Sequence, residues 1–385
     1  MKVLKICVST WENASPDKRE LSVCRELGAD VVVAAKGPVN GQRDKVDGFP
    51  VIRLSTRPLG QRVPVGLNRL SSLFTWAADV RRMDADVISG HDLTGLLIGW
   101  LSNIGKQKKA KLVYDSREFE LGRNTQRSKL DLLLVCWLER FLMNRCAFSI
   151  MVNDSIADEV QRIHHLKERP VVVRNIPAYW TLDAAATAQA RRELLSQLSL
   201  PEDTFLALYH GVVTNNRGVE NLLQAVATLP GTAAVVLGNG QPEYLDSLRH
   251  LSVELGISDR VLFHPAVPLE ELRHYVSAAD VGLVTVLPLY KSYYFMLPNK
   301  FFECIQSLTP VIVSDFPEVG RIVDQYGIGL KVDPADVSAI AAAIEQMRTG
   351  RSFYASCKAN LQKAKEDLCW EKEKSRLKEA YEKIL

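Results

Sequence analysis

Short apolar runs rich in β-branched residues alternate with amphipathic stretches along most of the chain. Strands that are covered on both faces, as in parallel sheets, appear as continuous apolar runs instead of alternating apolar and polar residues. In the first half we expect such strands at 3–9, 30–35, 51–54, 86–90, 111–115, 148–152 and 171–174. The amphipathic stretches 18–28 and 155–166 between them predict helices. The alternation predicts a doubly wound α/β domain.

The second half repeats the pattern, so the chain has two series of strands and helices. Its predicted strands are 205–211, 233–238, 260–264, 281–286, 310–314 and 329–332, with helices at 219–229 and 268–279. A chain of 385 residues is too long for one ordinary core. We therefore predict two Rossmann-like domains, a first or N-terminal one and a second or C-terminal one. We place the domains at 1–178 and 179–368, followed by a charged amphipathic helix at 369–385.

Composition excludes several classes of protein. The net charge of +3 argues against a dedicated nucleic-acid binder. Seven scattered cysteines without a C-x-x-C pair predict free thiols in a reducing cytoplasm instead of disulfides or a zinc site. The most apolar segment, 130–148, is interrupted by Glu139 and Arg140, so we expect no membrane span. We expect the N-terminus to form a strand and not a signal peptide.

Two motifs follow predicted strands of the second half, where ligands bind on such sheets. The segment 209–226 predicts a strand, a loop and a helix, with Gly211 and Gly218 allowing close backbone approach. Arg217 and the start of that helix would attract a phosphate group. The alternative is an ordinary turn with a solvated arginine.

In the second motif, LPNKFFE, the helix begins at Pro298 or Asn299. Lys300 and Glu303 then lie one turn apart on one face. A carboxylate there can accept hydrogen bonds from the two adjacent hydroxyls of a ribose. The alternative is a surface ion pair between Lys300 and Glu303, which would contribute little stability.

With LGNGQ, RVLFHPAVPLEEL, SAADVGLV and PVIVSDFPE, these motifs resemble the retaining nucleotide-sugar glycosyltransferases of family 4. The resemblance covers the second half and extends more weakly to the first through ISGHDL, LVYDSREFE and VRNIP. It implies the GT-B fold, in which two Rossmann-like domains face each other across a cleft. It also implies that the last helix crosses back to the N-terminal domain.

The resemblance assigns roles to individual residues. Glu303 would bind the nucleotide ribose, and Arg217, with Lys300 as a second cation, would neutralise the leaving diphosphate. His91 would lie near the transferred sugar; alternatively it caps a helix or lies in the core. The expected catalytic residues are His91, Arg217, Lys300 and Glu303. The expected donor-binding residues are Gly211, Arg217, Gly238, Gly240, His264, Pro265, Leu297, Pro298, Asn299, Lys300 and Glu303.

The sequence departs from the family pattern in three places. Phe295 stands where the first glutamate of the E-x7-E motif belongs, so Lys300 or backbone N–H groups of 295–298 would contact the sugar. Val212 replaces an arginine of the phosphate loop. The segment 9–20 replaces a double glycine, and it either forms a solvated loop or supplies side chains for the acceptor or the donor phosphate. The expected acceptor-binding residues are Trp11, Asn13, Lys18, Arg19, Asp92, Arg117 and Glu118, and Asp17 is a further candidate.

The segment 57–83 is both basic and apolar. Such a helix can rest on an anionic membrane where a lipid-linked acceptor waits, or it can face the core with a solvated basic side.

The complete interpretation is a cytoplasmic retaining glycosyltransferase, peripheral to the inner face of the membrane. It transfers a sugar from a UDP- or GDP-sugar to a saccharide or lipid-linked hydroxyl in bacterial polysaccharide or glycolipid synthesis. No metal or other cofactor is expected, because no acidic cluster is evident in the sequence. The alternatives are a sugar-nucleotide epimerase or hydrolase with the same fold, and a non-catalytic scaffold.

Overall fold

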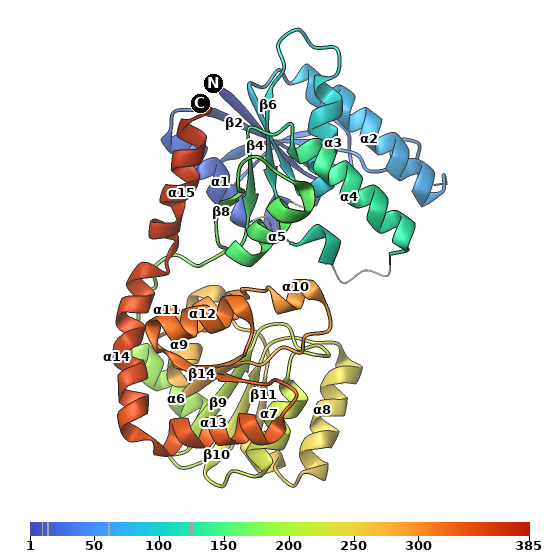
Figure 1. Ribbon diagram of the computed structural model, residues 1–385. Helices are drawn as coiled ribbons and strands as arrows, with labels where there is room; N and C mark the ends of the chain where they lie inside the picture. The colour runs from blue at the N-terminus through green and yellow to red at the C-terminus, as the bar shows by residue number, and fades with distance from the viewer. Residues whose placement is uncertain (10, 14, 61, 117, 123–126) are drawn as a thin grey trace. The chain divides into compact units, whose positions relative to one another are not determined.

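The computed structural model describes the chain except for residues 10, 14, 61, 117 and 123–126. Its contacts divide the chain into two compact units (Figure 1). The first unit is Met1–Arg174 together with Glu373–Leu385, and the second is Asn175–Lys372. The chain thus leaves the first unit once and returns to it for its last residues.

The first unit contains, among its described residues, an eight-stranded sheet in the order β3-β4-β2-β1-β5-β6-β7-β8. Neighbouring strands are parallel except β3 and β4. The strands are β1 (Lys2–Cys7), β2 (Asp30–Lys36), β3 (Arg43–Val46), β4 (Phe49–Leu54), β5 (Val87–His91), β6 (Lys111–Asp115), β7 (Phe148–Met151) and β8 (Val171–Val172).

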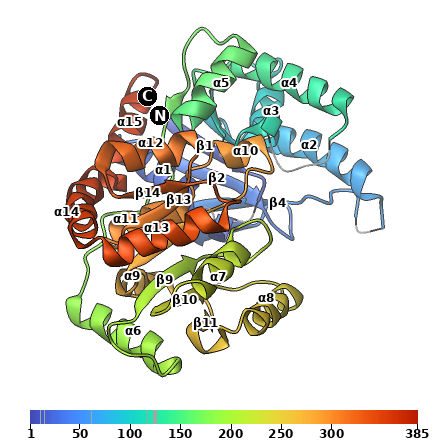
Figure 2. The same ribbon diagram turned by 60° about the horizontal axis from the view of Figure 1, so that its bottom comes forward.

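Helices cover both faces of this sheet. They are α1 (Ser15–Glu26), α2 (Val65–Arg82), α3 (Asp92–Asn103), α4 (Lys129–Met143), α5 (Asp154–His164) and α15 (Trp370–Glu382). On β1, Lys5 points to the face that α1 and α15 cover, where it binds Glu20 and Tyr381 also reaches Glu20. Ile6 points to the opposite face, close to α3. There α2, α3 and α4 lie next to one another (Figure 2).

The second unit contains a parallel sheet in the order β11-β10-β9-β12-β13-β14. The strands are β9 (Phe205–His210), β10 (Thr232–Leu237), β11 (Val261–His264), β12 (Val281–Val284), β13 (Val311–Ser314) and β14 (Gly329–Val332). The helices are α6 (Ala184–Gln197), α7 (Val219–Ala227), α8 (Pro242–Glu254), α9 (Leu269–Ala278), α10 (Lys291–Tyr294), α11 (Asn299–Gln306), α12 (Pro317–Tyr326), α13 (Val337–Thr349) and α14 (Arg351–Asp367).

The central strand β9 shows why its sequence is continuously apolar. Leu206 and Leu208 belong to a core shared with α6, α9, α11, α12 and α14. Ala207 and Tyr209 point the other way, into a core shared with α7, α8 and α13. Because both faces are covered, all residues of β9 are buried. Such a doubly covered parallel sheet opens its ligand sites at the carboxyl ends of its strands.

Two segments differ from the sequence-based prediction. Strand β3 was missed because RDKV has no apolar run. It forms because Asp47 and Gly48, with φ of 49° and 78°, make the tight turn that pairs it with β4. The segment expected as a loop before residue 18 instead holds a 3-10 helix, Trp11–Asn13, and the start of α1 at Ser15.

Candidate active site

Glycines bring two loops together at the carboxyl edge of the second sheet. Gly211 and Gly238 follow β9 and β10 with φ of 109° and 153°. A Cβ atom on Gly238 would lie 1.8 Å from the Gly211 carbonyl oxygen, and one on Gly240 would lie 2.4 Å from that of Val213. Side chains at Gly238 and Gly240 would therefore separate the loops. Gly211, Gly238 and Gly240, all predicted to bind the donor, thus allow the backbones of the two loops to come into contact.

The loop after β9 ends at the start of α7. Gly218 is the N-terminal cap of this helix with φ of 81°, and a Cβ atom there would lie 2.1 Å from the carbonyl oxygen of Thr285. Arg217 precedes it and is half-buried, with its guanidinium 5.0 Å from the ring centre of Tyr293 in α10. The first turn of α7 and the arginine form a positively polarised edge.

Lys300, in the first turn of α11, is buried with 9% of its surface exposed. Its Nζ lies 3.7 Å from the ring centre of Tyr209 and has no hydrogen-bond partner in the described part of the chain. Burial, and next the nearby positive charge of Arg217, lower the pKa of Lys300 to about 7. A buried amine without an acceptor is costly, which marks this position as one that a ligand would complete.

Glu303 lies one turn after Lys300 but binds a different residue. Its Oε2 is 2.9 Å from Nε2 of His210, the last residue of β9, which is 2% exposed. The alternative of a surface ion pair between Lys300 and Glu303 is therefore wrong: Lys300 is buried, and the carboxylate is held by the histidine. We missed His210, although it stands directly before the first glycine of the loop.

The other predicted donor-binding residues lie around the same sheet edge. Leu297 and Pro298 are partly buried, and Pro298 precedes α11. Asn299 is exposed and accepts a hydrogen bond from Asn175 at 3.0 Å. His264 ends β11, where its backbone oxygen accepts from the Gly238 N–H at 2.9 Å, and exposed Pro265 follows it.

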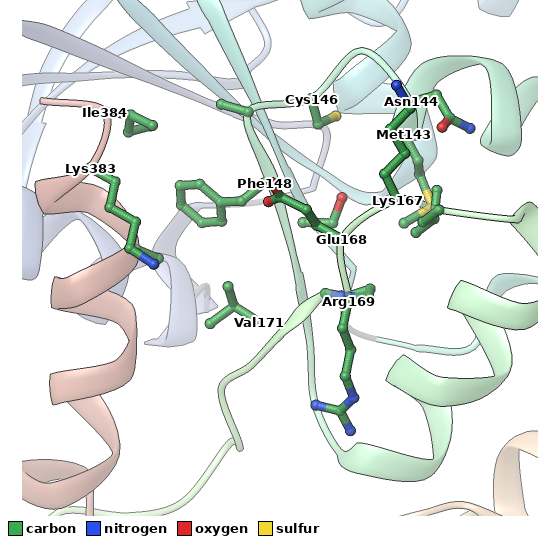
Figure 3. Close-up of a pocket in the computed structure, with 15 residues that line it drawn as sticks. Met143, Asn144, Cys146, Phe148, Lys167, Glu168, Arg169, Val171, Lys383 and Ile384 are labelled. Carbon is green, nitrogen blue, oxygen red and sulfur yellow. The ribbon is translucent and has the colours of Figure 1, made fainter.

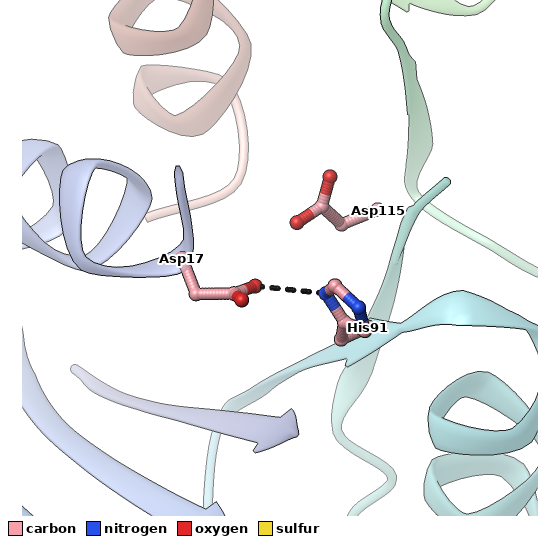
Figure 4. A group of neighbouring side chains, drawn as sticks. All are labelled: Asp17, His91 and Asp115. Carbon is pink, nitrogen blue, oxygen red and sulfur yellow. Dashed lines mark hydrogen bonds and ion pairs between the residues drawn. The ribbon is translucent and has the colours of Figure 1, made fainter. Parts of the chain in front are cut away.

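In the first unit, His91 is the last residue of β5. Its Nδ1 lies 3.2 Å from Oδ1 of Asp17 (Figure 4). Its Nε2 lies 3.5 Å from Oδ2 of Asp92. Burial opposes protonation, but the hydrogen bond to Asp17 and the charge of Asp17 outweigh it, so the pKa of His91 lies above its ordinary value. Asp92 adopts a left-handed backbone with φ of 56° at the start of α3. The imidazole is thus oriented between two carboxylates.

Behind His91 lies a buried charge cluster that the sequence did not reveal. Nζ of the fully buried Lys5 lies 2.9 Å from Asp17, 2.6 Å from Asp115 and 3.1 Å from Ser89, and it also binds Glu20. Asp17, His91 and Asp115 bring ligand atoms within 4.8 Å of one another, a spacing that would suit a metal ion (Figure 4). The Lys5 ammonium, however, already binds both of these aspartates.

Two family models match most of the chain. The model of the glycosyl transferase 4-like domain matches residues 21–176, and that of the glycosyl transferases group 1 matches residues 190–364. The chain belongs to the group 1 glycosyltransferases. The predictions of fold class and enzyme class are confirmed: the protein is a glycosyltransferase with two Rossmann-like domains of the GT-B fold.

Related proteins and structures agree with this assignment. A D-inositol 3-phosphate glycosyltransferase of Xylanimonas cellulosilytica is 25% identical over 92% of this chain and 87% of its own. The lipopolysaccharide core biosynthesis glycosyltransferase LpsE of Rhizobium meliloti is 30% identical over 41% of this chain and 44% of its own.

Among solved structures, sucrose-phosphate synthase from Thermosynechococcus elongatus has a TM-score of 0.75 at 19% identity. HepE from Anabaena, in complex with UDP, has a TM-score of 0.76 at 15% identity. Both comparisons cover 100% of this chain and 99% of the other chain, and they show likeness of fold.

The predicted acceptor-binding residues of the glycosyltransferase differ in their burial and in the contacts that they make. Trp11 is fully buried and packs edge-to-face on Phe49 at 5.6 Å. The prediction that Trp11 contacts an acceptor is therefore wrong for this structure, because the turn at Trp11–Asn13 directs the ring inward. Lys18 is partly buried and binds Asp47 and the carbonyl oxygen of Glu12, each at 2.6 Å.

The remaining acceptor candidates are described less fully. Arg19 is half-buried in α1, and Glu118 is exposed. Asn13 ends the 3-10 helix. Arg117 lies outside the described residues.

The departures from the family pattern also have clear positions. Phe295 follows α10 and packs on Tyr294, with ring centres 5.6 Å apart. Val212 is 73% exposed in the loop after β9. Neither position carries a charge that could replace the glutamate or arginine of the family, so of the cations expected for the diphosphate, Arg217 and Lys300 remain.

The first unit contains a cavity of about 410 Å³ (Figure 3). Its walls include Phe148 at the start of β7, Arg169, and Lys383 near the end of the chain. Phe148 begins its strand, whereas His91 is the last residue of its own strand. Arg169 is already bound by Asp154 and Asp158. The cavity contains none of the predicted site residues, and we assign it no role in the site.

Proposed function

We propose that this glycosyltransferase moves a sugar from a UDP- or GDP-sugar to a hydroxyl of a saccharide or lipid-linked acceptor, with retention of anomeric configuration. The observation that carries the proposal is the buried Lys300 amine, which has no hydrogen-bond partner among the described residues and feels the charge of Arg217. Two cations, each beside the N-terminus of a different helix, need a counter-charge. A nucleotide diphosphate supplies one and matches these donors.

The second unit would bind the donor in parts. Glu303 accepts hydrogen bonds from the ribose hydroxyls, while Arg217 and Lys300 bind the diphosphate. The close approach of the loops at Gly211 and Gly238 leaves backbone where a nucleotide can lie. The structures of HepE with UDP and with UDP-glucose support a nucleotide-sugar donor for this fold.

The proposed reaction exchanges one bond at the anomeric carbon for another on the same face. The bond from that carbon to the diphosphate oxygen breaks, and the electron pair leaves with the diphosphate. The acceptor oxygen forms the new bond, and its proton passes to a departing phosphate oxygen. Arg217 and Lys300 stabilise the charge that develops on the leaving group, so the proposal requires no metal or other cofactor.

The first unit would bind the acceptor. His91, oriented by Asp17, would contact the transferred sugar, and Asp92, Lys18, Arg19 and Glu118 are the described candidates around the acceptor. The name of LpsE, which refers to lipopolysaccharide core biosynthesis, supports a role in bacterial surface polysaccharide or glycolipid synthesis.

Exposed apolar stripes on the first unit support contact with a membrane. On α4, Leu130, Leu133, Leu134 and Trp137 are 64% to 72% exposed at helical spacing. On α2, Trp76 faces the core, whereas Leu67, Leu70 and Phe74 are 56% to 60% exposed. Such stripes are unusual on a protein that only meets water.

Positive charges beside the stripes favour an anionic surface as the partner. The exposed basic residues on the two helices and in the segments beside them include Arg62, Arg69, Arg81, Arg82, Lys129, Arg140 and Arg145. No described helix is long and apolar enough to cross a membrane. We therefore propose that α2 and α4 rest on an anionic membrane, on its cytoplasmic side, where a lipid-linked acceptor is presented.

A thermal-shift titration with UDP, GDP, ADP, CMP and dTDP tests the donor. A ligand that binds only the native state raises the melting temperature. We expect UDP or GDP to stabilise the wild type and to stabilise Glu303→Ala much less. Loss of response to every nucleotide in a folded protein would instead favour a scaffold. Release of free sugar without any acceptor would favour a hydrolase.

A further inference from the structure

Two groups of opposite charge lie one turn apart on α11. Lys300 carries an amine that has no hydrogen-bond partner in the described parts of the chain, and Glu303 carries a carboxylate that lowers the cost of charging that amine. Left to themselves, such neighbours at helical spacing form an ion pair. A paired Lys300 would be less available to a phosphate, and a paired Glu303 would be less available to a ribose.

In the structure, Glu303 binds His210 instead. Its ring comes from the end of β9, a different element, and its Nε2 lies 2.9 Å from Oε2 of Glu303. Because His210 is 2% exposed, solvent does not compete for the contact. Glu303 retains 17% exposure of its side chain, so its carboxylate is reached both by the histidine and from outside. The histidine thus holds one oxygen and does not engage the other.

We propose that His210 is a positioning residue for donor binding. It fixes one oxygen of Glu303 so that the other accepts the hydroxyl pair of a ribose, and it keeps Glu303 away from Lys300 so that the amine stays available for a diphosphate. This inference rests on the proposed function, which assigns Glu303 to the ribose. It adds that the specificity for a ribose depends on a strand residue that does not itself touch the nucleotide.

The test separates the ribose contact from the phosphate contact. For the nucleoside diphosphate that stabilises the wild type, the Kd is measured by calorimetry and compared with the Kd of its 2′,3′-dideoxy analogue. The ratio of the two reports the contact with the hydroxyl pair. We expect a ratio of about tenfold or more in the wild type, since hydrogen bonds to charged groups have that magnitude. Inorganic pyrophosphate, measured alone, reports the phosphate contact.

His210→Phe removes the imidazole N–H group that donates a hydrogen bond to Glu303. We expect the ratio to fall close to one, and the Kd for pyrophosphate to rise about tenfold because Glu303 then pairs with Lys300. In the double variant His210→Phe with Glu303→Ala, pyrophosphate affinity returns to that of Glu303→Ala alone. His210→Gln keeps an N–H donor and is expected to retain most of the wild-type ratio. A residue that only stabilised the fold would not restore pyrophosphate binding in the double variant.

The outcomes separate the two proposals. If Glu303→Ala keeps the wild-type ratio, the assignment of Glu303 to the ribose fails. If Glu303→Ala loses the ratio while His210→Phe keeps it, only the inference about His210 is overturned. The melting temperature without ligand shows whether each variant is folded. Should the phenyl ring prevent folding, His210→Leu is measured in its place with the same expectations.

Discussion

Lys300 connects protonation with ligand binding. Burial and the charge of Arg217 bring its pKa to about 7, so in the empty protein the amine loses its charge as the pH rises through that value. A bound diphosphate favours the charged form and raises the pKa again. Above pH 7, binding must therefore include the uptake of a proton, whereas closer to pH 6 the amine is charged beforehand.

This predicts that nucleotide affinity falls as the pH rises from 7 to 9. The Kd should increase by up to about tenfold per pH unit, the limit for one linked proton. Calorimetry in buffers of different ionisation enthalpy measures the proton uptake directly. Lys300→Met should bind more weakly and show a flat profile over the same range. A wild type that takes up no proton at pH 8 would contradict the proposed contact between Lys300 and the phosphate.

At the scale of elements, the Lys5 cluster ties strands and helices of the first unit together. Lys5 lies on β1, Asp17 and Glu20 on α1, and Asp115 at the end of β6. Burial raises the pKa of Glu20 even though Lys5 opposes that effect. The cluster therefore keeps acidic groups in the interior only because the ammonium is there.

Lys5→Met should lower the free energy of unfolding at pH 7.5 by roughly 3–5 kcal/mol, because it leaves buried carboxylates without their cation. The loss should shrink as the pH falls toward 5, where the carboxylates can take up protons. Urea unfolding at both pH values measures this, and Lys45→Met, at an exposed position on β3, serves as the matched control. An equal loss at both pH values would show that packing, and not charge, explains the effect.

The stripe on α4 makes a second prediction at this scale. Changing Leu134 and Trp137 to glutamine should reduce binding to anionic vesicles by about tenfold or more, since each large side chain contributes on the order of 1.5–3 kcal/mol when buried. Sedimentation with vesicles measures the bound fraction, and added salt should weaken binding further. Val253→Gln is the control, because Val253 is 66% exposed on α8 of the other unit. Unchanged binding of the α4 variant would exclude this helix as the contact.

Local spacing was enough to predict part of the site. Arg217 and Gly218 precede one helix, and Lys300 and Glu303 share another, so sequence distance gives their neighbourhood directly. The contact of His210 with Glu303 spans 93 positions and depends on how β9 and α11 pack. No local pattern carries that information.

Burial was harder to predict than secondary structure. Trp11 stands in a polar segment, yet the turn directs it into the core. The Lys5 cluster was missed for a related reason: its contact with Asp115 spans 110 positions and requires that β1, β5 and β6 be neighbours in the sheet. Apolar runs predict strands, but the order of the strands decides which polar residues meet.

At the scale of the whole molecule, the last residues complete the first unit. Tyr381 on α15 is fully buried, donates its O–H to Glu20 and packs edge-to-face on Phe148 at 5.2 Å. Glu373, near the start of the same helix, binds Arg174. A segment distant in sequence thus closes the face of the sheet that carries Lys5.

Tyr381→Ala should lower the stability of the first unit by roughly 3–5 kcal/mol, because it leaves a cavity and removes a donor from a buried carboxylate. Hydrogen exchange should show lost protection in β1 and α1, with β9 and β10 unchanged. Glu382→Ala, at the neighbouring exposed position, should leave both regions as they are. Equal loss of protection in β9 would mean that the effect is not confined to the first unit.

This closure has a consequence for synthesis on the ribosome. Residues 1–174 emerge before the second unit, but α15, which covers Lys5 and Glu20, emerges after it. Until α15 is made, the nascent first unit exposes Phe148 and the charged groups of Lys5 and Glu20. The second unit, by contrast, is one continuous segment and can fold as soon as it is released. The first unit is thus synthesised before the second but is completed after it. Between the synthesis of residue 174 and that of α15, a chaperone would find an apolar surface to bind.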